Sequence, residues 1–340
     1  MCARQESFQS VNALSTLPWF ELRDGRLALR DRDVPPAIDV HSHLALSYVR
    51  PLAFDLFAAP RPTEHYLPLQ RPLDLDVYVN RNLHDEDLAN LKRDLTLGPL
   101  RSGGMRVTHT AANLLREMGE LGVAASVLLP IDYPVLSSNA KTYLGVAARE
   151  RRLLGFGSVH PFSRDVAGKL RRQKAAGARG IKFHPAVQLV APDHPRSLAL
   201  FHEAGAVGLP VLMHCGPVGI EAPRLRKLCQ VPRYERALVE NPRTTFVLGH
   251  SGALQMEEAL ALAKRYDNVY LEISCQSVSH VRRILAEGPP DRLLFGSDWP
   301  FYHQAIPLAK VLLATEGNPG LRRRVLHENA ERLLGLRVTS

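Results

Sequence analysis

Residues 245–274 read TFVLGHSGALQMEEALALAKRYDNVYLEIS and contain one complete example of the pattern that decides the fold. A short apolar run, TFVLGH, is followed by the amphipathic stretch MEEALALAKRYD and then by a second apolar run, NVYLEIS. Short apolar runs are typical of buried strands, and an amphipathic stretch of this length is typical of a helix packed against them. The segment therefore predicts a strand, a helix and a strand in succession.

The same alternation continues through most of the chain. Eight apolar runs are predicted strands: 37–41, 125–130, 154–160, 180–184, 210–214, 245–250, 268–274 and 292–298. Helical stretches between them, such as AANLLREMGELG and SLALFHEAGAVG, end in glycine, which closes helices in the left-handed conformation. About 250 residues suffice for eight such units, so an α/β fold of the (β/α)8 TIM-barrel type is predicted. A doubly wound sheet is the alternative, but no GxGxxG or GxxxxGK[ST] motif follows any run.

Two segments lie outside this alternation. The stretch WFELRDGRLALRD predicts a hairpin, because its Asp24-Gly25 dipeptide suits a tight type I′ turn. We therefore expect a small N-terminal β flap over residues 1–36 and the barrel over residues 37–340. The segment from about 44 to 106 is too long for a structureless loop, and it predicts a partly helical cap inserted between the first strand and the first helix. We expect this cap to cover the barrel mouth and to select the substrate.

The composition is that of an ordinary globular protein, with 45% hydrophobic and 23% charged residues. The formal net charge of +9 is spread over short basic clusters that adjoin acids, so neither nucleic acid nor a membrane is an expected partner, although the charge favours anionic substrates. The four cysteines form no CxxC pair and imply no disulfide framework. No apolar run reaches signal-peptide or membrane-span length, which predicts a cytoplasmic location.

Histidines and an aspartate stand where the predicted strands end. His41 and His43 point to the same side of the first strand because side chains alternate, and later runs end in His214, His250 and Asp298. In TIM barrels the catalytic groups converge at the carboxyl ends of the strands. Imidazole and carboxylate are the usual ligands of zinc and similar divalent ions. Five such residues on four strand ends therefore predict a catalytic metal centre.

At these residues the sequence resembles the amidohydrolase superfamily and, within it, the amidohydrolase-2 family. The matching stretches are DVHSH, GIKFHPAVQ, LPVLMHCG, FVLGHSG, LLFGSDWPF and the terminal NAERLLGL. They extend from about residue 37 to the end of the chain and leave the flap and the cap unmatched. The resemblance implies that His41, His43, His214 and Asp298 bind a metal. It also implies that His250 either binds a second metal or polarises the substrate.

Lys182, in the stretch GIKFH, bears on the number of ions. In binuclear members of the superfamily that the sequence resembles, a lysine ending the fourth strand is carboxylated and bridges two metals. An ammonium about 4 Å from a divalent ion would be repelled by about 8 kcal/mol at an effective dielectric constant of 20. Lys182 is therefore either carboxylated or kept away from the metal. We favour two ions over one and zinc as the metal, with manganese, iron and nickel left open.

Other polar residues could contact the substrate or orient the ligands. His184 shares a face with Lys182 and is a candidate ligand or substrate contact. Glu272 could orient a ligand histidine, as carboxylates commonly do. The remaining candidates for substrate contacts lie near the strand ends or in the cap: His160, Gln188, Ser274, His303, Tyr48, Arg50, Tyr66, Arg71 and Tyr78.

The leading hypothesis is a metal-dependent hydrolase that uses a metal-activated hydroxide on an amide, lactone, ester or phosphoester. Asp298 would relay a proton to the leaving group, and His250 would polarise the substrate. The alternative is nonhydrolytic decarboxylation of an aromatic or unsaturated carboxylic acid, because the family that the sequence resembles also contains mononuclear decarboxylases. Two metals and a carboxylated Lys182 would favour the hydrolase, whereas one metal and a free lysine would favour the decarboxylase.

A noncatalytic barrel scaffold is the third hypothesis. It predicts that metal ligands are missing, and no ligand of the resembled pattern is missing from the sequence. The expected partner is a small-molecule substrate, with an anionic one favoured. A homodimer or a higher oligomer is compatible with the sequence.

Overall fold

The computed structural model describes residues 6–30, 33–48, 52–98, 103–133 and 137–336. Eight of the described strands are parallel and correspond in order to the eight apolar runs of the sequence. They are β4 (Ala37–Ser42), β6 (Val123–Leu128), β7 (Leu153–Gly155), β8 (Ile181–Phe183), β9 (Val211–His214), β10 (Phe246–Gly249), β11 (Val269–Glu272) and β12 (Leu293–Leu294). The prediction of a (β/α)8 barrel is confirmed.

The barrel closes through two short contacts between its sheets. Strands β4, β6 and β7 form one sheet, and β8 to β12 form the other. A parallel bridge joins Ser42 to Trp299, and a second one joins Gly157 to Ile181. The amide of Lys182 also donates to the carbonyl of Gly157 at 2.8 Å. The ends of all eight strands are thereby brought to one mouth of the barrel.

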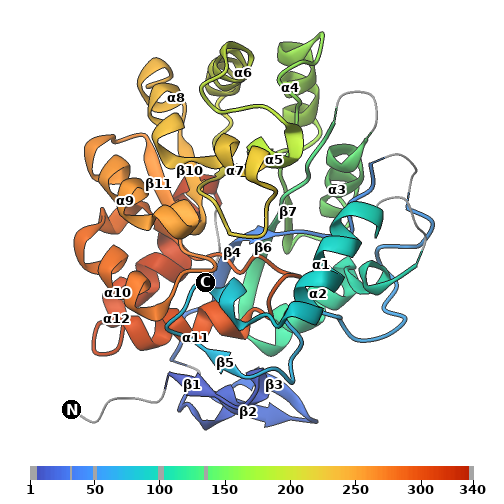
Figure 1. Ribbon diagram of the computed structural model, residues 1–340, viewed down its shortest axis with the longest axis vertical. Coiled ribbons are helices and arrows are strands. Elements are labelled where there is room, and N and C mark those ends of the chain that lie inside the picture. The colour runs from blue at the N-terminus through green and yellow to red at the C-terminus, as the bar shows by residue number, and fades with distance from the viewer. Residues whose placement is uncertain (1–5, 31–32, 49–51, 99–102, 134–136, 337–340) are drawn as a thin grey trace.

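Helices follow the strands and surround them (Figure 1). The larger ones are α2 (Ala111–Glu120), α3 (Asn139–Ala147), α4 (Val166–Ala175), α6 (Pro195–Ala206), α8 (Glu235–Glu240), α9 (Met256–Arg265), α10 (Val278–Glu287) and α11 (Ala305–Ala314). Shorter helical turns are α5 (Pro185–Gln188), α7 (Pro223–Arg226), η5 (Lys227–Cys229), η6 (Val231–Arg233), η7 (His250–Gln255), η8 (Pro290–Arg292), α12 (Pro319–Arg323), η9 (Arg324–Glu328) and α13 (Asn329–Leu334). No described helix combines the length and the hydrophobicity needed to cross a membrane.

The apolar core supports the strand ends from below. A smaller cluster contains Leu212 of β9 and Leu294 of β12, together with Leu334 at the end of α13. Because strand side chains alternate, Leu212 shares its face with His214, two residues further along β9. The polar residues at the barrel mouth therefore stand above a packed apolar layer, which restricts their movement.

The N-terminal flap contains the expected hairpin. Strands β2 (Phe20–Arg23) and β3 (Arg26–Leu29) pair in the antiparallel direction, after the helical turn η1 (Val11–Thr16). Asp24 and Gly25 both have positive φ, at 51° and 73°, as a type I′ turn requires. The sequence did not anticipate that β1 (Ser7–Phe8) pairs with β5 (Leu73–Asp74) of the cap. Backbone hydrogen bonds thus join the flap to the cap.

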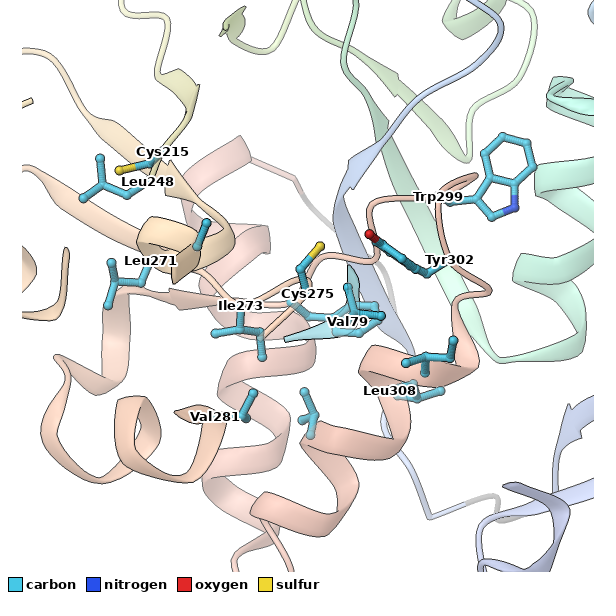
Figure 2. Close-up of a cluster of buried hydrophobic side chains, with 14 of the residues drawn as sticks. Val79, Cys215, Leu248, Leu271, Ile273, Cys275, Val281, Trp299, Tyr302 and Leu308 are labelled. Atoms are coloured by element: carbon cyan, nitrogen blue, oxygen red, sulfur yellow. The ribbon is translucent and has the colours of Figure 1, made fainter. Parts of the chain in front are cut away.

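The cap is partly helical and is fixed to the barrel mouth. Besides β5 it contains η2 (Val79–Asn82), α1 (Asp85–Leu97) and η4 (Met105–Thr108). The amide of Val79 donates to the carbonyl of Cys275 at 3.0 Å, and the amide of Val278 donates to the carbonyl of Leu75 at 2.8 Å. Figure 2 shows Val79, Cys275 and Tyr302 together at this junction. The helical turn η2 of the cap is thus bonded to the loop that follows β11.

Candidate metal centre

The structure brings five of the residues that the sequence suggested as ligands to one buried centre. His41 lies on β4, His214 ends β9 and His250 directly follows β10, while His43 and Asp298 follow β4 and β12. The ring centroids of His41 and His43 are 5.2 Å apart, those of His41 and His250 are 4.7 Å apart, and those of His214 and His250 are 4.9 Å apart.

Two of these residues have an unfavourable backbone conformation. His250 and Asp298 have φ values of 55° and 60°, in the left-handed region that non-glycine residues rarely adopt. Hydrogen bonds hold both in place, because the amide of Asp298 donates to the carbonyl of His41 at 2.8 Å and the amide of His250 donates to Glu272 at 3.0 Å. Strain of this kind is concentrated at functional sites, where the surrounding structure maintains it.

Three side chains have the spacing of metal ligands. Oδ1 of Asp298 is 3.6 Å from Nε2 of His41 and 3.6 Å from Nε2 of His43. A tetrahedral zinc ion with bonds of 2.0–2.1 Å places its ligand atoms about 3.4 Å apart. All three atoms lie within 4.8 Å of one another, so these residues fit a divalent ion.

The outer nitrogens of His41 and His43 are held by acceptors. Nδ1 of His41 lies 2.7 Å from Oε2 of Glu272, and Nδ1 of His43 lies 2.8 Å from the carbonyl of Leu129. Burial lowers the pKa of His43 to about 3 and the pKa of His41 well below its usual value, so both imidazoles are neutral at pH 7. Each therefore has its proton on Nδ1 and a lone pair on the inward Nε2, as metal binding requires.

His214 supplies a further free nitrogen. Its Nδ1 lies 3.2 Å from Nε2 of His250, whereas its own Nε2 is buried and has no hydrogen-bond partner among the described residues. Burial lowers the pKa of His214 to about 3, so this ring is neutral as well. Buried polar atoms in native proteins almost always have a partner, and a metal ion would provide one here.

Lys182 lies inside the centre rather than away from it. Its side chain is buried, and Nζ is 3.0 Å from Nε2 of His41, the nitrogen that faces Asp298. Burial lowers the pKa of Lys182 to about 8, while the charges of Asp298 and Glu272 raise it. Burial likewise raises the pKa of Asp298. A metal bound to His41 would compete with this amine for the same lone pair.

Sequence reasoning missed Cys275, which it treated only as a member of the cysteine count. Cys275 lies three residues after the end of β11, and its Sγ donates to Oδ2 of Asp298 at 3.5 Å. His250, Cys275 and Asp298 form a second group with ligand spacing, and His41, His250 and Glu272 form a third. Its place directly after the predicted run 268–274 was the signal that could have identified Cys275.

The residues proposed as substrate contacts have different surroundings. His184 stacks on His214 with ring centroids 4.0 Å apart, and its Nδ1 accepts from the amide of Val187 at 3.4 Å. Both nitrogens of His160 are engaged by backbone, because Nδ1 accepts from Phe162 and Nε2 lies 2.8 Å from the carbonyl of Gln188. The Gln188 side chain is likewise occupied, since it donates to the carbonyl of Asp132.

The other candidates contact residues outside the histidine cluster or lie outside the described residues. Nε2 of His303 faces Glu117 at 3.8 Å, and its Nδ1 accepts from the amide of Ala305. Tyr48 lies edge-on to Tyr133, with centroids 5.2 Å apart. Arg50 lies outside the described residues. His160 and His303 have no nitrogen directed at the histidine cluster, so His184 has the best-placed ring of these candidates.

Tyr78 of the cap has a position that the sequence did not distinguish from that of the other cap tyrosines. Its hydroxyl is buried and has no hydrogen-bond partner among the described residues. Burial raises the pKa of this phenol well above its usual value, and the charges of Cys275, Tyr302 and Asp298 raise it further. Tyr78 precedes Val79, whose amide is bonded to the carbonyl of Cys275, so the residue lies beside the loop that follows β11, and its hydroxyl is a buried donor without an acceptor among the described residues.

Comparisons with known proteins agree with this fold. The family model described as amidohydrolase (amidohydrolase-2) matches residues 38–336. No curated protein matches the chain. Among solved structures, the chain is similar to an uncharacterised TIM-barrel protein from Bordetella bronchiseptica. That structure has 19% identity and a TM-score of 0.62, and the match covers 88% of this chain and 98% of that one.

Two further solved structures have names that bear on chemistry. One is an amidohydrolase from Burkholderia multivorans with bound zinc, at 16% identity and a TM-score of 0.56, covering 88% of this chain and 99% of that one. The other is 2,6-dihydroxybenzoate decarboxylase from Rhizobium, at 15% identity and a TM-score of 0.53, covering 87% and 99%. At these identities the similarity shows the fold and does not identify the reaction.

Proposed function

Because the chain belongs to the amidohydrolase-2 family, which contains metal-dependent hydrolases and decarboxylases, we propose that it is a metal-dependent hydrolase. Its divalent ion would be held by His41, His43, His214 and Asp298. The observation that most supports this proposal is the placement of Asp298 Oδ1 at 3.6 Å from the Nε2 atoms of both His41 and His43. Zinc suits a site of three imidazoles and one carboxylate.

Each proposed ligand has a defined chemical task. A divalent ion held by these residues would polarise the substrate and would lower the pKa of a bound water towards about 7. Asp298 would accept a proton from the attacking water and return it to the leaving group. Because the imidazoles are neutral and Asp298 is the proposed anionic ligand, the centre would keep a positive charge with a divalent ion bound. It therefore favours anionic substrates among the amides, lactones, esters and phosphoesters.

Lys182 decides how many ions such a centre would hold. A carboxylated amine would become an anionic ligand and would allow a second ion, as the sequence led us to expect. An unmodified amine would have to move from Nε2 of His41 when the ion binds, because ammonium and ion repel each other. Hydrolysis is chemically complete with one ion, since one activated water and one base suffice.

Decarboxylation is the second candidate, and the position of Lys182 favours it. Nζ is buried 3.0 Å from Nε2 of His41, and no carboxylate oxygen of the described residues lies within 4.0 Å of it. A protonated amine placed in this way could bind the carboxylate of an aromatic acid. The similarity to a protein named as a decarboxylase makes this reaction worth testing.

The experiment combines metal depletion with a panel of lactones and aromatic carboxylates, including 2,6-dihydroxybenzoate. Protein treated with a chelator should be inactive and should recover on addition of zinc or manganese. Ring opening of a lactone would support the hydrolase, whereas release of carbon dioxide would support the decarboxylase. His41→Ala should not recover on reloading, but His202→Ala, on the exposed face of α6, should behave like wild type. Full activity in metal-depleted protein would contradict both reactions.

A further inference from the structure

Glu272, at the end of β11, is the acceptor for several groups of the centre. Its Oε2 lies 2.7 Å from Nδ1 of His41, 2.9 Å from Oγ of Ser274 and 3.0 Å from the amide of His250. The carboxylate is fully buried and is surrounded by donors. Burial raises the pKa of Glu272 to about 7, while the backbone amides of His250 and Ser274, which can only donate, favour its ionised form. An ionised carboxylate only accepts hydrogen bonds, so in this form Glu272 receives the protons of His41 and Ser274 as well.

The proton of Ser274 determines the protonation of the next ring. A hydroxyl has one proton, and that of Ser274 is donated to Glu272. Oγ of Ser274 must therefore accept from Nδ1 of His250, which lies 2.8 Å away. A neutral imidazole has one N–H, so Nε2 of His250 keeps a lone pair.

The same reasoning extends to His214. Nε2 of His250 is 3.2 Å from Nδ1 of His214, and a lone pair at Nε2 requires that His214 donates from Nδ1. The proton of His214 is then on Nδ1, and its lone pair is on Nε2. That Nε2 is the buried nitrogen that has no partner among the described residues.

We infer that Glu272, Ser274 and His250 form a hydrogen-bond relay that holds His214 as its Nδ1–H tautomer and so presents the Nε2 lone pair to a divalent cation. The cation itself rests on the proposed function, whereas the relay rests on the hydrogen bonds. His250 becomes a positioning residue rather than a ligand of a second ion. The arrangement accordingly predicts one ion per chain.

The relay can be distinguished from a general stabilising role of Glu272, because Glu272 acts on His41 and on His214 through separate hydrogen bonds. Glu272 fixes His41 directly, but it fixes His214 only through Ser274 and His250. Removal of the Ser274 hydroxyl should therefore release the tautomers of His250 and His214 and leave that of His41 unchanged. A variant that only loosens the fold would affect all three rings alike.

The first test uses the full-length, metal-free protein labelled with 15N-histidine. Long-range 1H–15N correlation spectra at pH 8, where Glu272 is mostly ionised, distinguish the Nδ1–H tautomer from the Nε2–H tautomer of each ring. The wild-type spectrum should show His41, His214 and His250 as Nδ1–H tautomers. In Ser274→Ala, His214 and His250 should lose this preference. An Nε2–H tautomer for His214 in the wild type, or unchanged tautomers in the variant, would overturn the relay.

The second test measures zinc binding by competition with a chromophoric chelator. Ser274→Ala should bind zinc about 10- to 100-fold more weakly, which is the usual effect of losing a group that orients a ligand. Ser274→Thr should restore the affinity because it keeps the hydroxyl. Ser126→Ala removes a buried serine that bonds Ser42 instead, and it should bind zinc like the wild type.

The two tests separate the relay from the proposed function. Unchanged zinc affinity in Ser274→Ala would overturn the relay's role in presenting the His214 lone pair. Wild-type protein with the expected tautomers but without zinc binding would contradict the proposed function and support the relay as a feature of the fold. The tautomers are read without metal, so this distinction does not depend on enzymatic activity.

Discussion

Asp298 combines features that lower the stability of a folded protein. It is buried, it follows β12 at a positive φ, and burial raises the pKa of its carboxyl group. The neighbouring Lys182 partly offsets this effect by favouring the ionised form. A carboxylate in such surroundings is well suited to bind a cation and to exchange a proton with the substrate.

Asp298→Asn tests that role at the residue scale. The substitution keeps the shape and removes the charge, so activity of the zinc-loaded protein should fall by about 10²- to 10⁴-fold, the usual contribution of a general base. Burial disfavours the ionised form, so the metal-free variant should unfold at a temperature no lower than wild type. Steady-state kinetics and calorimetry measure the two effects. Asp291→Asn, at an exposed position before β12, is the matched control. Activity within tenfold of wild type would show that Asp298 is not the base.

At the scale of elements, the cap holds a buried donor, the hydroxyl of Tyr78, beside the loop that follows β11. Hydrogen bonds between Leu75 and Val278 and between Val79 and Cys275 fix the segment that contains Tyr78. Asn80 strengthens this attachment, because it donates to the carbonyl of Val218 and accepts from the hydroxyl of Tyr302. The hydroxyl of Tyr78 is thus held in place before a substrate arrives.

Tyr78→Phe should lower kcat/KM about tenfold for the substrate that the panel identifies, the loss expected for one hydrogen bond. The unfolding temperature should be unchanged or higher, because the variant removes a buried hydroxyl that lacks a protein partner. Tyr66→Phe is the control, since the Tyr66 hydroxyl donates to Asp94 at 2.5 Å. It should lower stability by about 1–3 kcal/mol and leave kcat/KM near wild type. The opposite pattern would place the catalytic contact at Tyr66.

On the scale of the whole molecule, periodicity was sufficient to predict the barrel. All eight apolar runs became strands, because short apolar runs between amphipathic helices have few other ways to be buried. Strands β7 and β12 are shorter than the apolar runs 154–160 and 292–298 that predicted them. Residues 156–160 and 295–298, which end the two predicted runs, lie outside the regular strands. The two-residue pairing of β1 with β5 was not predictable, since it joins segments far apart in the sequence.

The site was less predictable than the fold. The strand ends indicated that His41, His43, His214, His250 and Asp298 converge, because all strand ends of a barrel meet at one mouth. The contact of Lys182 with His41 and the chain of hydrogen bonds from Glu272 to His214 depend on side-chain conformations across neighbouring strands. His160 ends the third predicted run and His303 lies five residues after the eighth, but both are engaged by neighbouring protein groups.

The most direct test of the metal centre is metal analysis of the purified protein together with anomalous diffraction at the absorption edge of the metal found. We predict one divalent ion per chain, with its anomalous peak between the Nε2 atoms of His41, His43 and His214 and the carboxylate of Asp298. Protein that contains no metal after purification and zinc addition, or a peak away from these four side chains, would contradict the account.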